Sequence, residues 1–393
     1  MLPATVRMRY RQFSIIRRRT DGQGAPDTAL LAAIALLFVL GLFALASSSS
    51  YYSFTRFGSW YRVVLYQMAA GGIPGLLLFS LFFSVDYRRW QRWGVFWLVL
   101  TLGSLLLVFV PGLGEVRNGA RSWVSLGPLT AQPAEAVKLT ALIFLSGWLA
   151  RIGFHDARSI GRGLVPFLAF TAAVLGLIAL QPDLGTLLVV AVILATVYYV
   201  SGAQLLYVGS LAIVSLALLG MVLMSGGYRT QRLLVFMNPD LDPQGTGYHL
   251  RQAKLAIGSG GWFGRGLGKS YQKFAYLPEV SADSIFAIVA EEMGFFVAAG
   301  LIVLLAFIIL RALRVARDAP DPFGRFLAVG IATWLGFQSF LNIAVMVGLA
   351  PLTGLPLPFI SAGGSALAAN LAAAGLLLNI SRHVPHAGGK RVQ

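Results

Sequence analysis

Residues 28–48 read TALLAAIALLFVLGLFALASS, an apolar run of 21 residues without a charged side chain. A helix of that length spans about 30 Å, which is the thickness of the hydrocarbon core of a bilayer. Nine similar runs follow along the chain, at 63–84, 94–111, 134–150, 164–181, 184–202, 204–225, 284–310, 325–349 and 365–381. The sequence therefore predicts an all-α polytopic membrane protein with about ten transmembrane helices. We interpret the first run as a retained span, because it follows a long Arg-rich tail and has no small-residue cleavage site.

The composition excludes most other classes of protein. Of the 393 residues, 57% are hydrophobic and only 12% are charged, whereas a soluble domain carries about 25% charged residues. A disordered chain needs the opposite balance. The chain contains no cysteine, which excludes disulfides, thiolate metal sites and cysteine nucleophiles. The net charge of +16 is explained by the positive-inside rule and by contact with anionic membrane lipid, so we expect no nucleic-acid partner.

Arginine and lysine residues set the predicted orientation. They are concentrated in the tail 1–27, in alternate short connections and in the tail 382–393. Because cytoplasmic segments carry this excess, we expect both tails in the cytoplasm, on either side of a single membrane domain at 28–381. The longest connection, 226–283, then forms a large extracytoplasmic loop between the seventh and eighth helices.

Several ionisable residues lie inside or at the ends of these spans, where they are expensive and face the protein interior. Glu135 and Lys138 share one helix face, as a structural ion pair or as part of a polar cavity. Asp183 starts a span and could be a helix cap or a site residue. Asp283 also starts a span, and its spacing alone favours a cap. At least one of Glu291 and Glu292 must face a wet or paired environment.

The remaining motifs are weaker. The glycine-rich run 258–270 ends in Gly-Lys-Ser, but Phe263 stands where a Walker A loop needs glycine. Such a turn-rich loop could still bring backbone N–H groups to an anion. The run 351–364 predicts a rigid re-entrant turn, which is tolerated at membrane depth where it is buried or lines a cavity. The histidines do not have metal-ligand spacing, so we predict no metal site from them.

Six short motifs occur in an order typical of one family. They are Gly119–Trp123, Gln132–Lys138, Gln181–Thr186, Leu277–Glu279 followed by Asp283, Ala290–Glu292 and Gly354–Ser361. Together they resemble the SEDS family (shape, elongation, division, sporulation), whose members are FtsW and RodA. The resemblance covers about residue 30 to His383. Within it, the strings at 258–273 and 379–383 are more similar to the division member, FtsW, than to RodA.

The resemblance implies a ten-helix peptidoglycan glycosyltransferase that polymerises lipid II at the outer face of the bacterial cytoplasmic membrane, at the division septum. It places the catalytic aspartate on Asp283. The chain departs from the family pattern around it, with Ser281-Ala282 in place of His-Thr and Ser284 in place of Phe. It also has 362–366 as Ala-Gly-Gly-Ser-Ala in place of Tyr-Gly-Gly-Ser-Ser. The implied partners are a class B penicillin-binding protein, which is a transpeptidase, and other division proteins.

Lipid II is a disaccharide-peptide on a polyprenyl diphosphate, so its polymerase needs an apolar groove, cations for the diphosphate and a base for the acceptor hydroxyl. Asp283 could take the proton of the acceptor 4-hydroxyl as that oxygen attacks the donor anomeric carbon, with inversion. Loop cations, with a divalent ion (Mg²⁺ or Mn²⁺) as a candidate helper, would stabilise the leaving diphosphate. The expected substrate-binding residues are Arg121, Gln132, Glu135, Lys138, Asp183, Arg229, Arg232, Lys254, Lys273 and Ser361.

Three alternatives stay open from the sequence. A lipid II flippase or transporter fits the many spans and the intramembrane charges, although the polar residues lie mainly in the outer half, which favours an enzyme. An elongation-type RodA polymerase would share the same motifs. A scaffold for division proteins would need no base at Asp283.

Overall fold

The computed structural model describes residues 24–384 apart from 118–119, 128, 225–227, 243 and 275. Within this part of the chain, seven helical stretches are long and apolar enough to cross a membrane. Five of them are single helices: α2 (Thr28–Phe57), α7 (Pro133–Ala157), α13 (Ile285–Asp318), α14 (Pro322–Val347) and α15 (Gly364–Ser381). The other two are continuous stretches of several segments. One consists of α3 (Arg62–Gln67), η1 (Met68–Gly72) and α4 (Ile73–Ser84), and the other of η2 (Ile160–Leu164) and α8 (Val165–Leu180). The predicted polytopic helical fold is confirmed.

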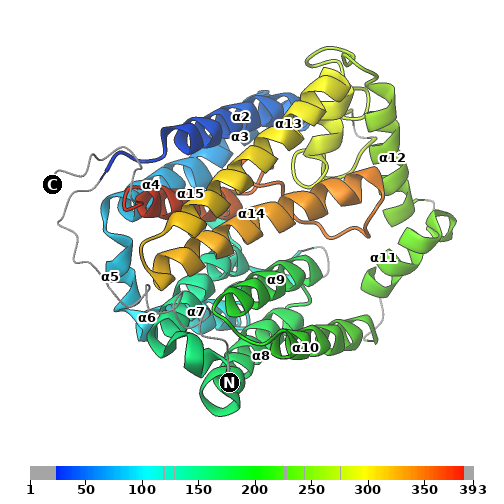
Figure 1. Cartoon of the computed structure of the whole chain (residues 1–393). Helices are drawn as coiled ribbons and strands as arrows, with labels where there is room; N and C mark the ends of the chain where they lie inside the picture. The colour runs from blue at the N-terminus through cyan, green and yellow to red at the C-terminus, as the bar shows by residue number, and fades with distance from the viewer. Residues whose placement is uncertain are drawn as a thin grey trace.

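The remaining predicted spans correspond to three shorter apolar helices. These are α6 (Gly94–Leu107), α9 (Leu184–Val200) and the stretch Leu205–Ala217 of α10 (Leu205–Met224). The short α5 (Tyr87–Gln91) connects α4 to α6. A helix therefore lies at each predicted span, while the number of membrane crossings stays a prediction. Figure 1 shows α15 in the middle of the bundle, packed between α4 and α14. Because nearly all of α15 is buried, small residues such as Ala372–Ala374 allow neighbouring helices to approach it closely.

A small antiparallel sheet between α6 and α7 was not predicted. Its strands, β1 (Gly114–Arg117), β2 (Ala120–Leu126) and β3 (Leu129–Ala131), pair in the order β1-β2-β3. On β2, Ser122 and Val124 are buried, whereas Arg121 and Trp123 are only partly covered. This alternation has the period of two that a half-buried strand requires. Strands this short leave little pattern in a sequence dominated by long apolar runs.

The connection predicted as a loop at 226–283 contains regular structure. It holds α11 (Tyr228–Met237), η3 (Pro239–Leu241) and α12 (Thr246–Ser259), followed by irregular chain. The helix α12 is amphipathic, because it buries Leu250, Ala253 and Ala256 and exposes Lys254 and Leu255. Figure 1 shows α11 and α12 at one end of the bundle, and α12 packs against α13.

The helix α13 is interrupted at Gly294, which has φ 78° and ψ −176°. The glycine-rich loop fills the interruption with its own backbone. The carbonyls of Glu291 and Glu292 accept hydrogen bonds from the N–H groups of residues 265 and 266 at 3.0 and 2.9 Å. Phe295 N–H donates to the carbonyl of residue 261 at 2.9 Å. A Cβ atom on Gly264 would lie 2.2 Å from the carbonyl oxygen of Glu292, so only glycine fits there.

The same part of α13 holds the chain that follows the glycine-rich loop. Glu292 pairs with Lys273, Nζ to Oε1, at 3.1 Å and accepts a hydrogen bond from Ser47. Glu291 accepts from the backbone N–H of Tyr271 at 2.9 Å. The prediction that these carboxylates lie in a paired environment is confirmed. Among the described residues, the anion that this following chain reaches with its backbone N–H is therefore the carboxylate of Glu291.

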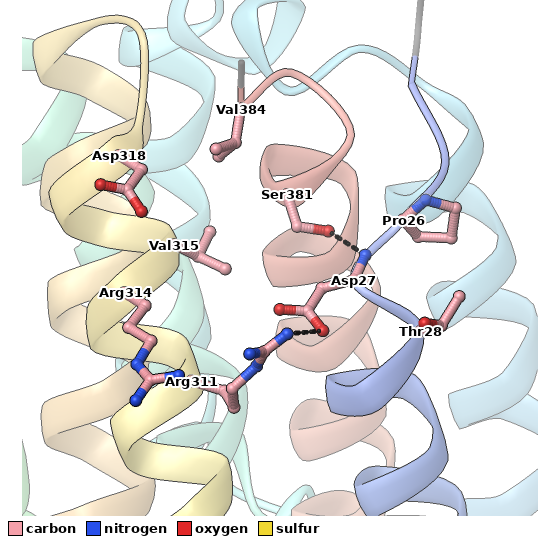
Figure 2. A pocket seen from close by; sticks show the side chains of 9 residues that line it. All are labelled: Pro26, Asp27, Thr28, Arg311, Arg314, Val315, Asp318, Ser381 and Val384. Carbon is pink, nitrogen blue, oxygen red and sulfur yellow. Dashed lines mark hydrogen bonds and ion pairs between the residues drawn. The ribbon is translucent and has the colours of Figure 1, made fainter. Parts of the chain in front are cut away.

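The opposite end of the bundle carries a separate polar cluster. Asp27, at the start of α2, accepts from Arg311 on α13 at 2.6 Å and donates its N–H to Ser381 on α15 at 3.0 Å. A cavity of about 270 Å³ opens beside them, as Figure 2 shows. Arg311 lies 28 residues after Asp283, which is about 40 Å along a helix. This cavity is therefore remote from the predicted site. Most of the predicted basic tails, at 1–23 and 385–393, lies outside the described residues.

Candidate functional site

Asp283 lies in a turn directly before α13 and is 7% exposed. The helix begins at Ile285 with Ser284 as its N-cap residue, and no side chain there makes a cap hydrogen bond. The carboxylate of Asp283 is therefore not used as the helix cap that its spacing suggests. Its backbone carbonyl accepts a hydrogen bond from Asn342 Nδ2 on α14 at 2.8 Å. The turn is also fixed to the re-entrant segment, since Ala362 N–H donates to the Ser281 carbonyl at 2.7 Å.

Burial raises the pKa of Asp283 to about 7, and the nearby carboxylate of Glu279 adds to this rise. The positive charge of Arg232 acts in the opposite direction and lowers the pKa of Asp283. A carboxyl group with a pKa near neutral pH can both accept and release a proton under physiological conditions, as a general base must. The environment of Asp283 therefore suits proton transfer.

Arg232 brings a cation from α11 to this carboxylate. Its Nη1 atom donates to the carbonyl of Leu352 at 3.3 Å, so the guanidinium lies against the first part of the re-entrant segment 351–363. The backbone of Arg229 lies on the same helix, one turn earlier, but its side chain is outside the described residues. Asp283 and Arg232, chosen separately from the sequence, thus come together at one end of the bundle. A carboxylate beside a guanidinium can deprotonate a hydroxyl while the cation attracts a phosphate.

Two buried amides on α14 were missed by the sequence reasoning. Asn342 Nδ2 donates to the carbonyl of Leu355 at 2.7 Å as well as to that of Asp283. One turn earlier, Gln338 Nε2 donates to the carbonyl of Pro356 at 2.7 Å. These amides hold the irregular segment 351–363 against α14. The signal was available, because two amides four residues apart inside an apolar span must face protein.

Glu135 and Lys138 form a buried ion pair on α7, as one of the two sequence interpretations predicted. Lys138 Nζ lies 2.7 Å from Glu135 Oε1 and 2.8 Å from Gln338 Oε1. The ammonium also lies 5.4 Å from the ring centroid of Trp334. The second oxygen of Glu135, Oε2, is buried without a hydrogen-bond partner among the described residues. Through Gln338, the pair supports the same segment that Asn342 joins to Asp283.

Asp183 takes the role of helix cap, one of the two roles that the sequence left open. It caps α9 by accepting from Thr186 N–H at 3.0 Å. Its other oxygen accepts from Gln132 Nε2, at the start of α7, at 2.9 Å. The backbone N–H of Gln132 donates in turn to Ser365 Oγ at 3.0 Å. Gln132 and Asp183 therefore join α7, α9 and α15 next to the Glu135–Lys138 pair.

The other predicted binding residues lie elsewhere. Arg121 is on β2 and Lys254 is on the exposed face of α12, close to Gly348. Lys273 is 5% exposed and pairs with Glu292, so it stabilises the loop and does not present its charge to a ligand. Ser361 is also buried, and its Oγ accepts from Leu357 N–H at 2.8 Å, which closes a turn of the re-entrant segment. Substrate contact by Lys273 or Ser361 would require these bonds to break.

No group of three histidine or acidic residues in the described part of the chain has the geometry to hold a metal ion. Two further polar side chains next to Asp283, those of His249 and Ser284, were not among the site residues predicted from the sequence. His249 on α12 is 8% exposed, and its Nε2 lies 2.6 Å from Ser284 Oγ. Burial lowers the pKa of His249 to about 4, and the charge of Arg232 contributes to this lowering. His249 is therefore neutral at physiological pH.

The chain is similar to known proteins over nearly its whole length. Residues 27–386 match the sequence model of the cell cycle proteins FtsW, RodA and SpoVE. The stage V sporulation protein E of Bacillus subtilis is 39% identical over 367 residues, covering 93% of this chain and 99% of that protein. A probable peptidoglycan glycosyltransferase FtsW of Thioalkalivibrio sp. (strain K90mix) is 38% identical over 370 residues, covering 93% of this chain and 92% of the relative.

Solved structures show the same likeness. A chain of a peptidoglycan synthase complex that coordinates polymerization and crosslinking superposes with a TM-score of 0.73 and 31% identity, covering 91% of this chain and 98% of the other. The rod shape determining protein RodA of Thermus thermophilus gives a TM-score of 0.65 and 32% identity, covering 92% of this chain and 98% of the other. With nearly its whole length matched in sequence and in structure, the chain belongs to the FtsW, RodA and SpoVE family of cell cycle proteins.

Proposed function

We propose that this membrane glycosyltransferase polymerises lipid II into peptidoglycan glycan strands, with Asp283 as the general base. The observation that carries the proposal is the buried carboxyl of Asp283 beside Arg232, in a chain whose relatives include peptidoglycan glycosyltransferases by name. The pKa of Asp283, about 7, supports proton transfer.

The proposed step needs one base and one group of cations. Asp283 takes the proton of the acceptor sugar's 4-hydroxyl, and that oxygen attacks the anomeric carbon of the donor. The bond from this carbon to the diphosphate oxygen breaks, and the polyprenyl diphosphate leaves as an anion. Arg232 attracts the diphosphate and stabilises the charge that builds on it. A second carboxylate is not required, since the leaving group does not need a proton, in contrast to glycoside hydrolysis. Assistance by a divalent cation stays a prediction.

The proposal includes the division septum as the site of action and a class B penicillin-binding protein as partner. Probable FtsW proteins among the relatives support the first. A structural neighbour drawn from a complex that coordinates polymerization and crosslinking supports the second. The elongation role is the alternative, and replacing either a division-type or a rod-type relative in cells with this chain separates the two.

Neutralising the cation at the site is expected to act on diphosphate recognition. Arg232→Gln should weaken binding of a lipid diphosphate by about 10- to 100-fold, the value of one or two charge-assisted hydrogen bonds. Binding of an uncharged lipid analogue should change little. Arg251→Gln is a matched control on α12, because Arg251 pairs with Asp240 at 3.6 Å on the loop surface. Equal losses for both ligands would show that Arg232 only holds the fold together.

The membrane leaflet from which lipid II is used separates a polymerase from a flippase. We expect purified protein, oriented uniformly in sealed vesicles, to make polymer only from lipid II in the leaflet that faces residues 226–283. Transfer of lipid II between leaflets should be no faster than in empty vesicles. Fast transfer without polymer, unchanged in Asp283→Asn, would reject the polymerase and leave the flippase.

A further inference from the structure

Three polar groups surround the Ser284 hydroxyl, and one of them is the carboxylate of the proposed base. His249 reaches it from α12, with Nε2 at 2.6 Å from Ser284 Oγ. The carbonyl of Pro278, in the preceding turn, accepts from the hydroxyl at 3.0 Å. Asp283 Oδ1 lies 3.5 Å from the same oxygen, at the limit of hydrogen-bonding distance. Histidine, hydroxyl and carboxylate therefore form a short chain of polar groups in a buried place.

The directions of these bonds follow from counting protons. A serine hydroxyl has one proton to give and two lone pairs that accept. If Ser284 donates to Pro278 or to Asp283, its contact with His249 must be a bond donated by Nε2–H. A neutral histidine has such a proton on one ring nitrogen. His249 is kept neutral by its burial and by the charge of Arg232.

We propose that His249 and Ser284 form a positioning couple that adjusts the protonation of Asp283. His249 donates to Ser284, and this bond polarises the hydroxyl and makes it a better donor. The single hydroxyl proton then points to Asp283 when that carboxylate is ionised, and to the Pro278 carbonyl when Asp283 has taken a proton. The inference rests on the proposed function, since it concerns the base of that reaction.

The other groups around Asp283 leave hydrogen-bond donation to its carboxylate as the role of the His249–Ser284 couple. The charged groups acting on Asp283 are Glu279, in the same turn, and Arg232, from α11. The contact from α14 is the amide of Asn342, which binds the backbone carbonyl of Asp283 and not its carboxylate. The residues 351–356 contain no titratable side chain. Ser284 is thus a neighbour that can donate a hydrogen bond to the carboxylate in one protonation state and withdraw it in the other.

The residue after Asp283 supports the His249–Ser284 couple, because it differs from the family pattern. The resemblance to the SEDS family implies Phe after the catalytic aspartate, whereas this chain has Ser284. Phenylalanine cannot accept a bond from a histidine or donate one to a carboxylate. A buried histidine facing that position would then have an unsatisfied N–H, which costs about 1–3 kcal/mol. Ser284 and His249 are therefore expected to depend on each other.

The test is the pH dependence of lipid II polymerisation by the purified full-length protein. Ser284→Ala and His249→Leu should each raise the pKa of Asp283, because the ionised carboxylate loses a donor. We expect the acid limb of the pH–rate profile to move to higher pH by roughly half a unit, which corresponds to about a threefold loss of rate at low pH. The loss should be recovered at high pH. The double variant should shift no more than one single variant, since both act through one bond.

Matched variants separate this role from a structural one. His249→Gln keeps an N–H donor and should leave the acid limb near its wild-type position. His155→Leu removes an exposed histidine on α7 and should not shift it. Thermal unfolding is measured for every variant, and Ser284→Ala carries the test if His249→Leu does not fold.

The outcomes distinguish failure at each level. A lower rate at every pH, with the acid limb of Ser284→Ala unmoved, would overturn the positioning couple and leave a structural role. Full additivity of the two shifts would also overturn it. A wild-type protein that makes no polymer, or an active Asp283→Asn variant, would instead reject the proposed function.

Discussion

Asp283→Asn is expected to reduce the rate of glycan polymerisation by about a thousandfold or more. General acid–base catalysis contributes about 10²–10⁴-fold to a rate, and the variant also loses a charge at the site. Asparagine has the shape of aspartate but cannot take a proton from the acceptor hydroxyl. The variant should still fold, because the backbone carbonyl bonded to Asn342 is unchanged. Polymer formed from labelled lipid II gives the measurement. Near-normal activity of Asp283→Asn would remove this residue as the base.

The pH dependence adds an independent check on the same residue. A base acts when ionised, so activity should fall as pH decreases through the pKa of Asp283, about 7. Glu279→Gln is the matched control, since the charge of Glu279 contributes to the raised pKa of Asp283. Its removal should lower that pKa and move the acid limb to lower pH. A shift in the opposite direction would contradict this electrostatic account.

Breaking the buried pair on α7 is expected to have the largest effect on stability. Glu135→Gln or Lys138→Met alone leaves an uncompensated charge, and loss of one partner of such a pair costs about 3–5 kcal/mol. Activity should fall as well, because Lys138 holds Gln338 and Gln338 holds the Pro356 carbonyl. The double variant should recover part of the lost stability. Thermal unfolding and polymerisation are measured for the wild type, the two single variants and the double variant, and this double-mutant cycle tests the coupling.

A surface pair supplies the control for that cycle. Arg317 and Asp318 form an ion pair at 3.0 Å, with 76% and 42% of their side chains exposed. Exposed pairs contribute little to stability, so neutralising both should not change the unfolding temperature measurably. Simple additivity at Glu135 and Lys138, matching this control, would contradict the structural role of the buried pair.

Long apolar runs made the fold predictable, because a span needs about 20 apolar residues and few other structures do. The chemistry of the site was only partly predictable. Asp283 and Arg232 are ionisable residues in an apolar chain, and such residues mark sites. His249 and Ser284 could not be paired in advance, since they are 35 residues apart and neither residue type is unusual in a loop.

The glycine-rich run shows why a motif without its surroundings misleads. Its spacing suggested a loop for an external anion, yet its backbone completes the hydrogen bonds that α13 loses at Gly294. No local pattern indicates where a loop inserts into a distant helix. The same limit applies to Lys273, which was predicted to meet substrate and instead meets Glu292. Its buried partner lies 19 residues further along the chain.

The insertion of this loop into α13 has a consequence for how the site can open. If the loop swung away as a lid, the carbonyls of Glu291 and Glu292 and the N–H of Phe295 would lose their partners. Each unpaired backbone group in an apolar medium costs several kcal/mol. The glycine-rich loop is therefore fixed against α13 where that helix is interrupted at Gly294.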